Sequence, residues 1–63
     1  MVIETSDYVY VLEFKLDGTA EDALHQIEER GYALPFESSG KQIFKIGVNF
    51  SSETKSIDRW TIA

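Results

Sequence analysis

The stretch Tyr8-Val-Tyr-Val-Leu-Glu-Phe-Lys-Leu16 decides the fold, because it carries the strongest strand signal in the chain. Side chains of a β-strand alternate between two faces. One face of this strand therefore receives five apolar side chains: Tyr8, Tyr10, Leu12, Phe14 and Leu16. The other face begins with Val9 and Val11 and ends with Glu13 and Lys15. We expect the even-numbered face to be a core face and the odd-numbered face to be at least half covered.

Glu13 and Lys15 lie side by side on the second face, where charged groups are costly unless they are paired or coordinate something. Three interpretations are open from these residues alone. The two side chains form an ion pair at the rim of the sheet, or Glu13 binds a metal ion while Lys15 orients a water, or Lys15 alone binds an anion. This short spacing is common by chance, so the surrounding sequence has to decide between them.

The chain has 63 residues, no cysteine and a formal net charge of −5. A domain of this size buries only about 60% of its unfolded surface and is marginally stable alone; without cysteine, it has no disulfide or thiolate zinc site. The acidic balance argues against a generic nucleic-acid-binding module, but not against a nuclease whose metal ion supplies positive charge. We expect a cytoplasmic protein with no membrane contact, because we find neither a membrane span nor a signal peptide.

The segment from Thr19 to Arg30 predicts a helix. Thr19 is a typical N-cap, acidic residues fall in the first turn, and Gly31 is a typical C-cap. The apolar stripe of this helix consists of Ala20, Ala23, Leu24 and Ile27. The small alanines would let the helix lie close against a sheet, and Gly47 would allow a close approach from the strand side. His25 lies off the stripe, at a solvated position.

Three further strands are predicted, over residues 1–4, 41–50 and 57–62. A short turn joins the first to the central strand, which favours an antiparallel hairpin. Pro35 and the run Ser38–Gly40 exclude a regular element between the helix and strand 41–50. The strand–helix–strand unit should be a right-handed crossover between parallel strands. The fold class is therefore α/β, with one helix on a small mixed sheet and the order strand, strand, helix, strand, strand.

The number of helices does not match the number of apolar faces. Strand 41–50 places Phe44, Ile46, Val48 and Phe50 on one face and Ile43 on the other. One helix covers only one face of a sheet, so we expect something else to pack on the second face. That layer would be another copy of the chain, giving a homo-oligomer, or further sequence; without it, we expect instability.

Short motifs along nearly the whole chain match one known family: Tyr8–Gly18, Ala23-Leu24, Gln26-Ile27, Gly31-Tyr32-Ala33, Ile46–Phe50 and Ile57–Trp60. Together they resemble the PD-(D/E)XK nuclease superfamily. The matching branch is found at the C-terminal end of bacterial proteins that have an ATPase-like N-terminal domain. The resemblance implies a restriction-endonuclease-like fold, a mixed sheet flanked by helices. It also implies metal-dependent hydrolysis of phosphodiesters, with nucleic acid as the partner.

The resemblance implies roles for four residues. Glu13 would be a ligand of Mg²⁺, and the backbone carbonyl of Phe14 would be a further ligand. Lys15 would orient or activate the attacking water and stabilise developing charge. Gln26, on the helix after the motif strand, would line the site. Such roles suit metal-assisted hydrolysis, and oxygen ligands suit magnesium.

The chain departs from the family pattern at the first acid, an Asp expected just before a segment like Val2–Thr5. The sequence starts at Met1, and the N-terminal helix and first strand of the family core are absent as well. We interpret residues 1–63 as one partial nuclease-like domain, truncated after its first metal ligand and inactive alone. Glu4 is the candidate substitute for the missing acid. The alternatives are a non-catalytic interaction module and a structural fragment that self-associates.

Overall fold

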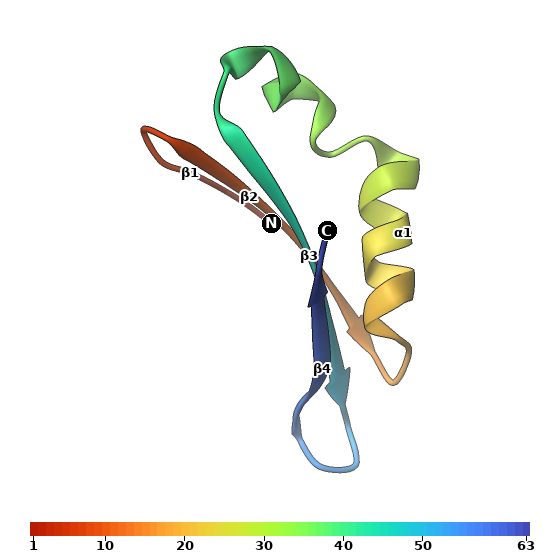
Figure 1. Cartoon of the computed structure of the whole chain (residues 1–63). Coiled ribbons are helices and arrows are strands. Elements are labelled where there is room, and N and C mark those ends of the chain that lie inside the picture. The colour runs from red at the N-terminus through yellow and green to blue at the C-terminus, as the bar shows by residue number, and fades with distance from the viewer.

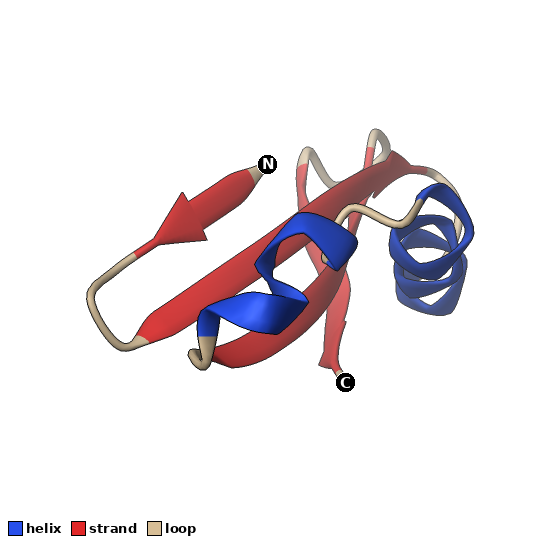
Figure 2. Cartoon of the chain, turned by 90° about the horizontal axis from the view of Figure 1, so that it is seen from above, coloured by secondary structure: helices blue, strands red, loops and turns tan.

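A computed structural model describes all 63 residues as a four-stranded sheet with two helices on one side (Figures 1 and 2). The elements in chain order are β1 (Val2–Glu4), β2 (Tyr8–Leu16), α1 (Ala20–Arg30), the 3₁₀ helix η1 (Leu34–Ser39), β3 (Gln42–Ser51) and β4 (Ser56–Ile62). The predicted α/β class and the predicted order of strands and α-helix are confirmed.

The four strands lie in the order β1-β2-β3-β4. β1 and β2 form the predicted antiparallel hairpin, β2 and β3 are parallel, and β3 and β4 are antiparallel. In the register of β2 and β3, Glu13 lies opposite Gly47 and Lys15 lies opposite Asn49. The parallel pair confirms that α1 belongs to a crossover connection, which brings the helix back over the two central strands (Figure 1).

Both predicted caps of α1 are present. The Thr19 hydroxyl accepts a hydrogen bond from the backbone N–H of Asp22 at 2.9 Å. Gly31 ends the helix with a left-handed backbone, φ 64°, a conformation that glycine adopts without steric cost. Ala20, Ala23 and Ile27 are the buried residues of the helix. Local sequence signals therefore fix both where this helix begins and ends and which side it buries.

The helix covers the odd-numbered face of β2, where Val9 and Val11 are fully buried together with Ile27. The expectation that the even-numbered face is the core is wrong. On that face Leu16 is 69% exposed, and no helix lies over it. The physical reason is the size of the side chains. Val9 and Val11 of β2 and Gly47 of β3 are small enough for a helix with alanines to pack close against this face. The predicted mismatch is confirmed, since one apolar face stays uncovered.

The connection after α1 contains a regular element that the sequence did not predict. Leu34–Ser39 form a 3₁₀ helix, with a hydrogen bond from the N–H of Phe36 to the carbonyl of Ala33 at 3.0 Å. Pro35 falls in its first turn, where the missing N–H is not needed, so proline begins this element rather than excluding it. Phe36 packs against the core cluster and extends the cover over β2.

Gly47 is the point of closest approach between α1 and the sheet. A Cβ atom at this position would lie 2.2 Å from the Ala20 carbonyl oxygen and 2.9 Å from the Leu24 nitrogen. Both are backbone atoms of the helix, so no side-chain rotation relieves the overlap. Gly47 therefore sets the distance between helix and sheet.

We predict that Gly47→Ala lowers the free energy of unfolding by about 1–3 kcal/mol or more, because the helix must move off the sheet. Gly18→Ala is the matched control, since its Cβ would meet only ordinary contacts, the nearest at 3.5 Å from the Lys15 Cβ. Urea unfolding followed by circular dichroism measures both variants at one protein concentration. Equal stability of the two would contradict this account of the interface.

Asp17 joins the β2–α1 turn to the β3–β4 hairpin. Its carboxylate accepts hydrogen bonds from the backbone N–H of Ser52, at 2.9 Å, and from the Ser52 hydroxyl. Its own N–H donates to the carbonyl of Phe50 at 2.8 Å. The Ser52 hydroxyl, followed by the Ser52 N–H, lowers the pKa of Asp17 from its ordinary value.

This lowered pKa gives stability a defined pH dependence. A carboxyl group with a lowered folded-state pKa stabilises the fold above its unfolded pKa, about 3.9, and loses this contribution as pH falls through the folded value. We expect Asp17→Asn to be less stable than the natural sequence at pH 7, with the difference shrinking below about pH 4. Ser52→Ala should behave similarly. Urea midpoints at several pH values test this, and a constant difference down to pH 2 would contradict it.

Candidate active site

Glu13 and Lys15 lie near the end of β2, on the side of the sheet that faces α1, and both are partly buried. No ion pair joins them; the ion pairs of the structure are His25–Glu29, Lys41–Glu4 and Lys45–Glu28. The Glu13 carboxylate instead accepts a hydrogen bond from the N–H of Phe14 at 3.2 Å. The ion-pair interpretation of the two residues is therefore wrong, and both charged groups stay free for other contacts.

The edge of β2 is open beside Glu13. Leu12 exchanges hydrogen bonds with Met1 in both directions, at 2.8 Å each, so its N–H and carbonyl point to the β1 side. Backbone groups two residues further along a strand point to the same edge. The N–H and carbonyl of Phe14 therefore point to this edge, where no residue of the chain lies opposite. The Phe14 carbonyl oxygen is accessible as a ligand next to the Glu13 carboxylate.

Lys15 and Gln26 line one open pocket of about 390 Å³. The pocket has no apolar lining, and its walls are Lys15 from β2 and five residues of α1: Asp22, His25, Gln26, Glu29 and Arg30. Glu13 is not part of this lining. The structure thus brings Gln26 close to Lys15. Glu13 lies on the same face of β2, two residues before Lys15.

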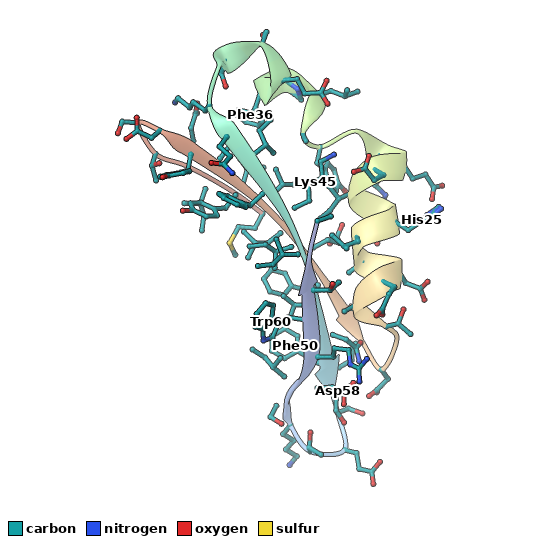
Figure 3. The ribbon with its side chains drawn as sticks, viewed as in Figure 1. His25, Phe36, Lys45, Phe50, Asp58 and Trp60 are labelled. Atoms are coloured by element: carbon teal, nitrogen blue, oxygen red, sulfur yellow. The ribbon has the colours of Figure 1, made fainter.

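His25 has the solvated position that its place off the apolar stripe predicted. Its side chain is exposed, points away from the sheet and lies 3.8 Å from the Glu29 carboxylate (Figure 3). This contact is an ion pair only when the imidazole is protonated. Nothing in its surroundings singles it out as a catalytic group.

Arg30 lines the same pocket as Lys15 and Gln26, and sequence reasoning missed this. Its guanidinium donates a hydrogen bond to the Tyr32 hydroxyl at 3.2 Å. Tyr32 raises the pKa of Arg30, and the Glu13 and Glu29 carboxylates add to this effect. The Glu13 carboxylate therefore has an electrostatic effect on the last turn of α1. The sequence offered only the preference of arginine for a last helical turn, which gave no hint of a contact with the site.

Asn49 is a second residue whose role the sequence did not reveal. It is almost fully buried, and its side-chain oxygen accepts a hydrogen bond from the N–H of Gly18 at 2.8 Å. Its side-chain nitrogen donates to Asp58 at 3.4 Å. Because Asn49 lies opposite Lys15 in the register, this network fixes the turn that follows the lysine. A lone buried amide in an apolar strand is the signal that could have indicated such a role.

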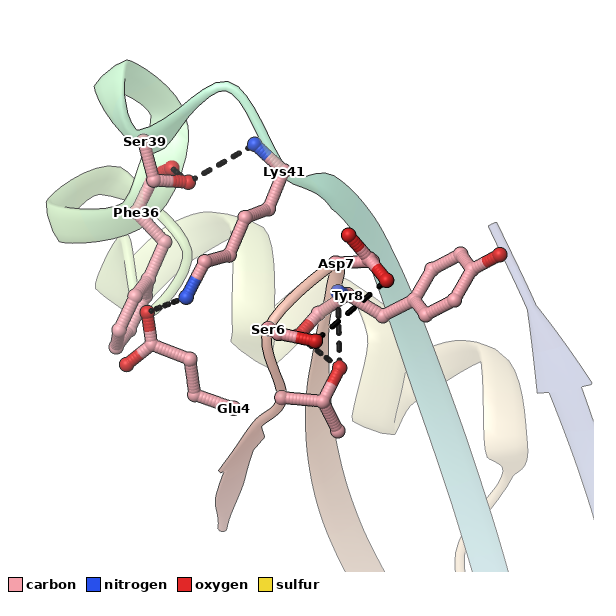
Figure 4. A network of polar contacts seen from close by, with 8 residues as sticks. Glu4, Ser6, Asp7, Tyr8, Phe36, Ser39 and Lys41 are labelled. Atoms are coloured by element: carbon pink, nitrogen blue, oxygen red, sulfur yellow. Dashed lines mark hydrogen bonds and ion pairs between the residues drawn. The ribbon is translucent and has the colours of Figure 1, made fainter.

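Glu4 lies next to the turn of the β1–β2 hairpin, beside Lys41 (Figure 4). It is opposite Val9, four residues before Glu13, a distance of roughly 13 Å along the strand. Its carboxylate binds the Lys41 ammonium group at 2.7 Å. In this structure Glu4 therefore does not join Glu13 as the missing acid.

The residues present fit a divalent cation only in part. No three carboxylate, histidine or cysteine side chains gather in one place on the chain. Glu13 and the Phe14 carbonyl offer two hard oxygen ligands on one stretch of β2. Mg²⁺ is often held by one or two carboxylates, with water and substrate phosphate completing its shell. The ligand chemistry is right for magnesium, but the protein oxygens are few.

The longest helix of the chain, α1 with 11 residues, is too short and too polar to cross a lipid bilayer.

Comparison with known proteins identifies the family. The PD-(D/E)XK nuclease superfamily matches residues 1–60. A protein of Azotobacter chroococcum mcd 1, described as "Uncharacterized protein in vnfD 5'region", is 34% identical over 59 residues, which make up 90% of this chain and 11% of that protein. The chain thus spans about a tenth of the length of this relative. No solved structure matches. Because the family match covers nearly the whole sequence, the chain belongs to the PD-(D/E)XK nuclease superfamily.

Proposed function

We propose that residues 1–63 form a metal-dependent nuclease-like domain whose half-site, with Glu13 as its only carboxylate ligand, binds Mg²⁺ weakly and does not cleave nucleic acid alone. Glu13 and the Phe14 carbonyl would hold the ion, and Lys15 would orient the attacking water. Gln26 would contact the site from α1. One observation carries the proposal. The Glu13 carboxylate, the free Phe14 carbonyl and the Lys15 ammonium follow one another at the open end of β2.

The bound ion would polarise the scissile phosphate and lower the pKa of a bound water. Lys15 supplies a positive charge next to this position, and Arg30 supplies a second one from the end of α1. A phosphodiester carries negative charge, so Lys15, Arg30 and a bound cation would have to attract it against Asp22 and Glu29 of the same pocket. Nucleic acid is the substrate class that the family suggests. Such a substrate agrees with the expected cytoplasmic location and with the ATPase-associated bacterial branch of the family.

The register of the hairpin defines the position from which a second acid would face Glu13. Val2 lies opposite Val11 and Ile3 lies opposite Tyr10. A residue added directly before Met1 in the same register would lie opposite Glu13, on the same face of the sheet. Opposed residues of an antiparallel pair have Cβ atoms about 4.5–5.5 Å apart, close enough for two carboxylates to share one ion. With Glu13 alone, the half-site has one carboxylate ligand, the smaller of the two numbers that usually hold Mg²⁺.

We expect a Mg²⁺ or Mn²⁺ titration to perturb the backbone amide signals of Glu13, Phe14, Lys15 and Gln26 with weak affinity, because one carboxylate and one carbonyl leave most of the ion's shell to water. Glu13→Gln should abolish these changes, because it removes the only carboxylate among the proposed ligands. Glu37→Gln, an equal change of charge at an exposed residue of η1, should leave them intact. Changes spread evenly over all acidic residues would refute the half-site.

We expect a three-residue extension that ends in Asp directly before Met1 to tighten metal binding roughly tenfold, the effect of about 1.4 kcal/mol. The same extension ending in Asn is the control for the added strand. The extended chain should cleave DNA or RNA in the presence of Mg²⁺, and Lys15→Ala in this background should remove the activity. If both extensions bind metal equally, the register argument is wrong.

A further inference from the structure

The second face of the sheet, the one without helices, is apolar except at Gln42, which lies opposite Tyr8. We call it the open face. Its most exposed side chains are Met1, Ile3, Leu16, Ile57, Trp60 and Ile62. They come from β1, β2 and β4 or their ends, and the partly exposed rings of Tyr8, Phe14, Phe44 and Phe50, from β2 and β3, belong to the same face. Figure 3 shows Trp60 and Phe50 on the side of the sheet away from α1.

No charged side chain of the strands lies on the open face. The charged residues of the strands project to the helix side: Glu4, Glu13, Lys15, Lys45, Asp58 and Arg59. Solvent-facing strands normally alternate apolar with polar residues. A face without charge in a chain that is 27% charged is therefore suited to an apolar partner, and unsuited to water or to the phosphates of nucleic acid.

The size of the open face matches a stable interface. Its large side chains expose roughly 800 Å² together, at about 150–250 Å² for a fully exposed large side chain. The largest apolar patch on a typical monomer is about 300–600 Å². A standard protein–protein interface buries about 800 Å² on each partner. The open face thus exceeds what a monomer of this size is expected to show and equals one side of a specific complex.

We propose that the open face is the interface of a homodimer in which two copies pack sheet against sheet. A two-fold axis brings the same patch of both copies together, which an uncharged patch permits without repulsion. Two facing sheets pack about 10 Å apart with side chains interdigitating. The dimer gives each chain the second layer of core that its single helical layer lacks. Glu13 and Lys15 lie on the opposite side of the sheet and stay accessible.

Sedimentation velocity on the 63-residue chain tests the proposal. We expect a species of twice the 7.2 kDa chain mass at about 100 µM, with dissociation on dilution. Leu16→Lys, and separately Ile62→Lys, should raise the dissociation constant roughly tenfold or more, because each buries a charge in the interface. Leu34→Lys is the matched control, since Leu34 is 64% exposed but lies in η1 on the helix side.

Trp60 is the only tryptophan and lies on the open face, so its fluorescence reports the same event. The emission should shift to longer wavelength as the natural chain is diluted, and be shifted already in Leu16→Lys but not in Leu34→Lys. A folded monomer at 100 µM, polydisperse aggregates or an unfolded chain would each overturn the proposal. So would a dimer that Leu34→Lys disrupts and the open-face variants do not.

Discussion

The seat of α1 on Gly47 is the constraint on which the rest of the structure depends. Backbone atoms of Ala20 and Leu24 lie where a side chain of β3 would otherwise stand. This contact decides which face of the sheet is covered and how deep Val9 and Val11 are buried. Gly47 lies directly opposite Glu13 of β2. The contact therefore also sets the distance between the helix that carries Gln26 and the strand that carries Lys15. A single missing Cβ therefore shapes both the core and the candidate site.

The secondary structure could be predicted from sequence because its signals are local. Thr19 and Gly31 cap the helix as their residue types predict, and the period-two pattern of residues 8–16 gives the central strand. The choice of covered face could not be found by counting apolar residues. The even-numbered face of β2 has more apolar residues, yet the helix packs on the odd-numbered face, where small residues allow close contact. Complementarity of size between two elements decided the outcome, and single-strand patterns do not contain that information.

The candidate site shows the same division between local and distant information. The spacing of Glu13 and Lys15 and the place of Gln26 were readable along the chain, as members of one motif. Arg30 was not, because it shares its pocket with Lys15 from β2, and Asn49 was not, because its partners come from other elements. Asn49 reaches Gly18 and Asp58, which are 31 and 9 residues away. Such residues act through geometry that exists only after the strands have paired, so no short pattern announces them.

The two faces of the sheet are chemically separate but mechanically joined through Phe14. Its ring lies on the open face, with its centroid 5.7 Å from that of Phe50. Its carbonyl lies at the edge of β2 beside Glu13, as a candidate metal ligand. A layer that covers the open face would hold the ring of Phe14 in one position and, through the backbone, its carbonyl as well. Association on one side of the sheet would thereby order a ligand at the other side, through Phe14, the one residue that belongs to both the open face and the site. The chain offers few protein oxygens to a metal ion. This restraint would lower the entropic cost of ordering the Phe14 carbonyl when the ion binds.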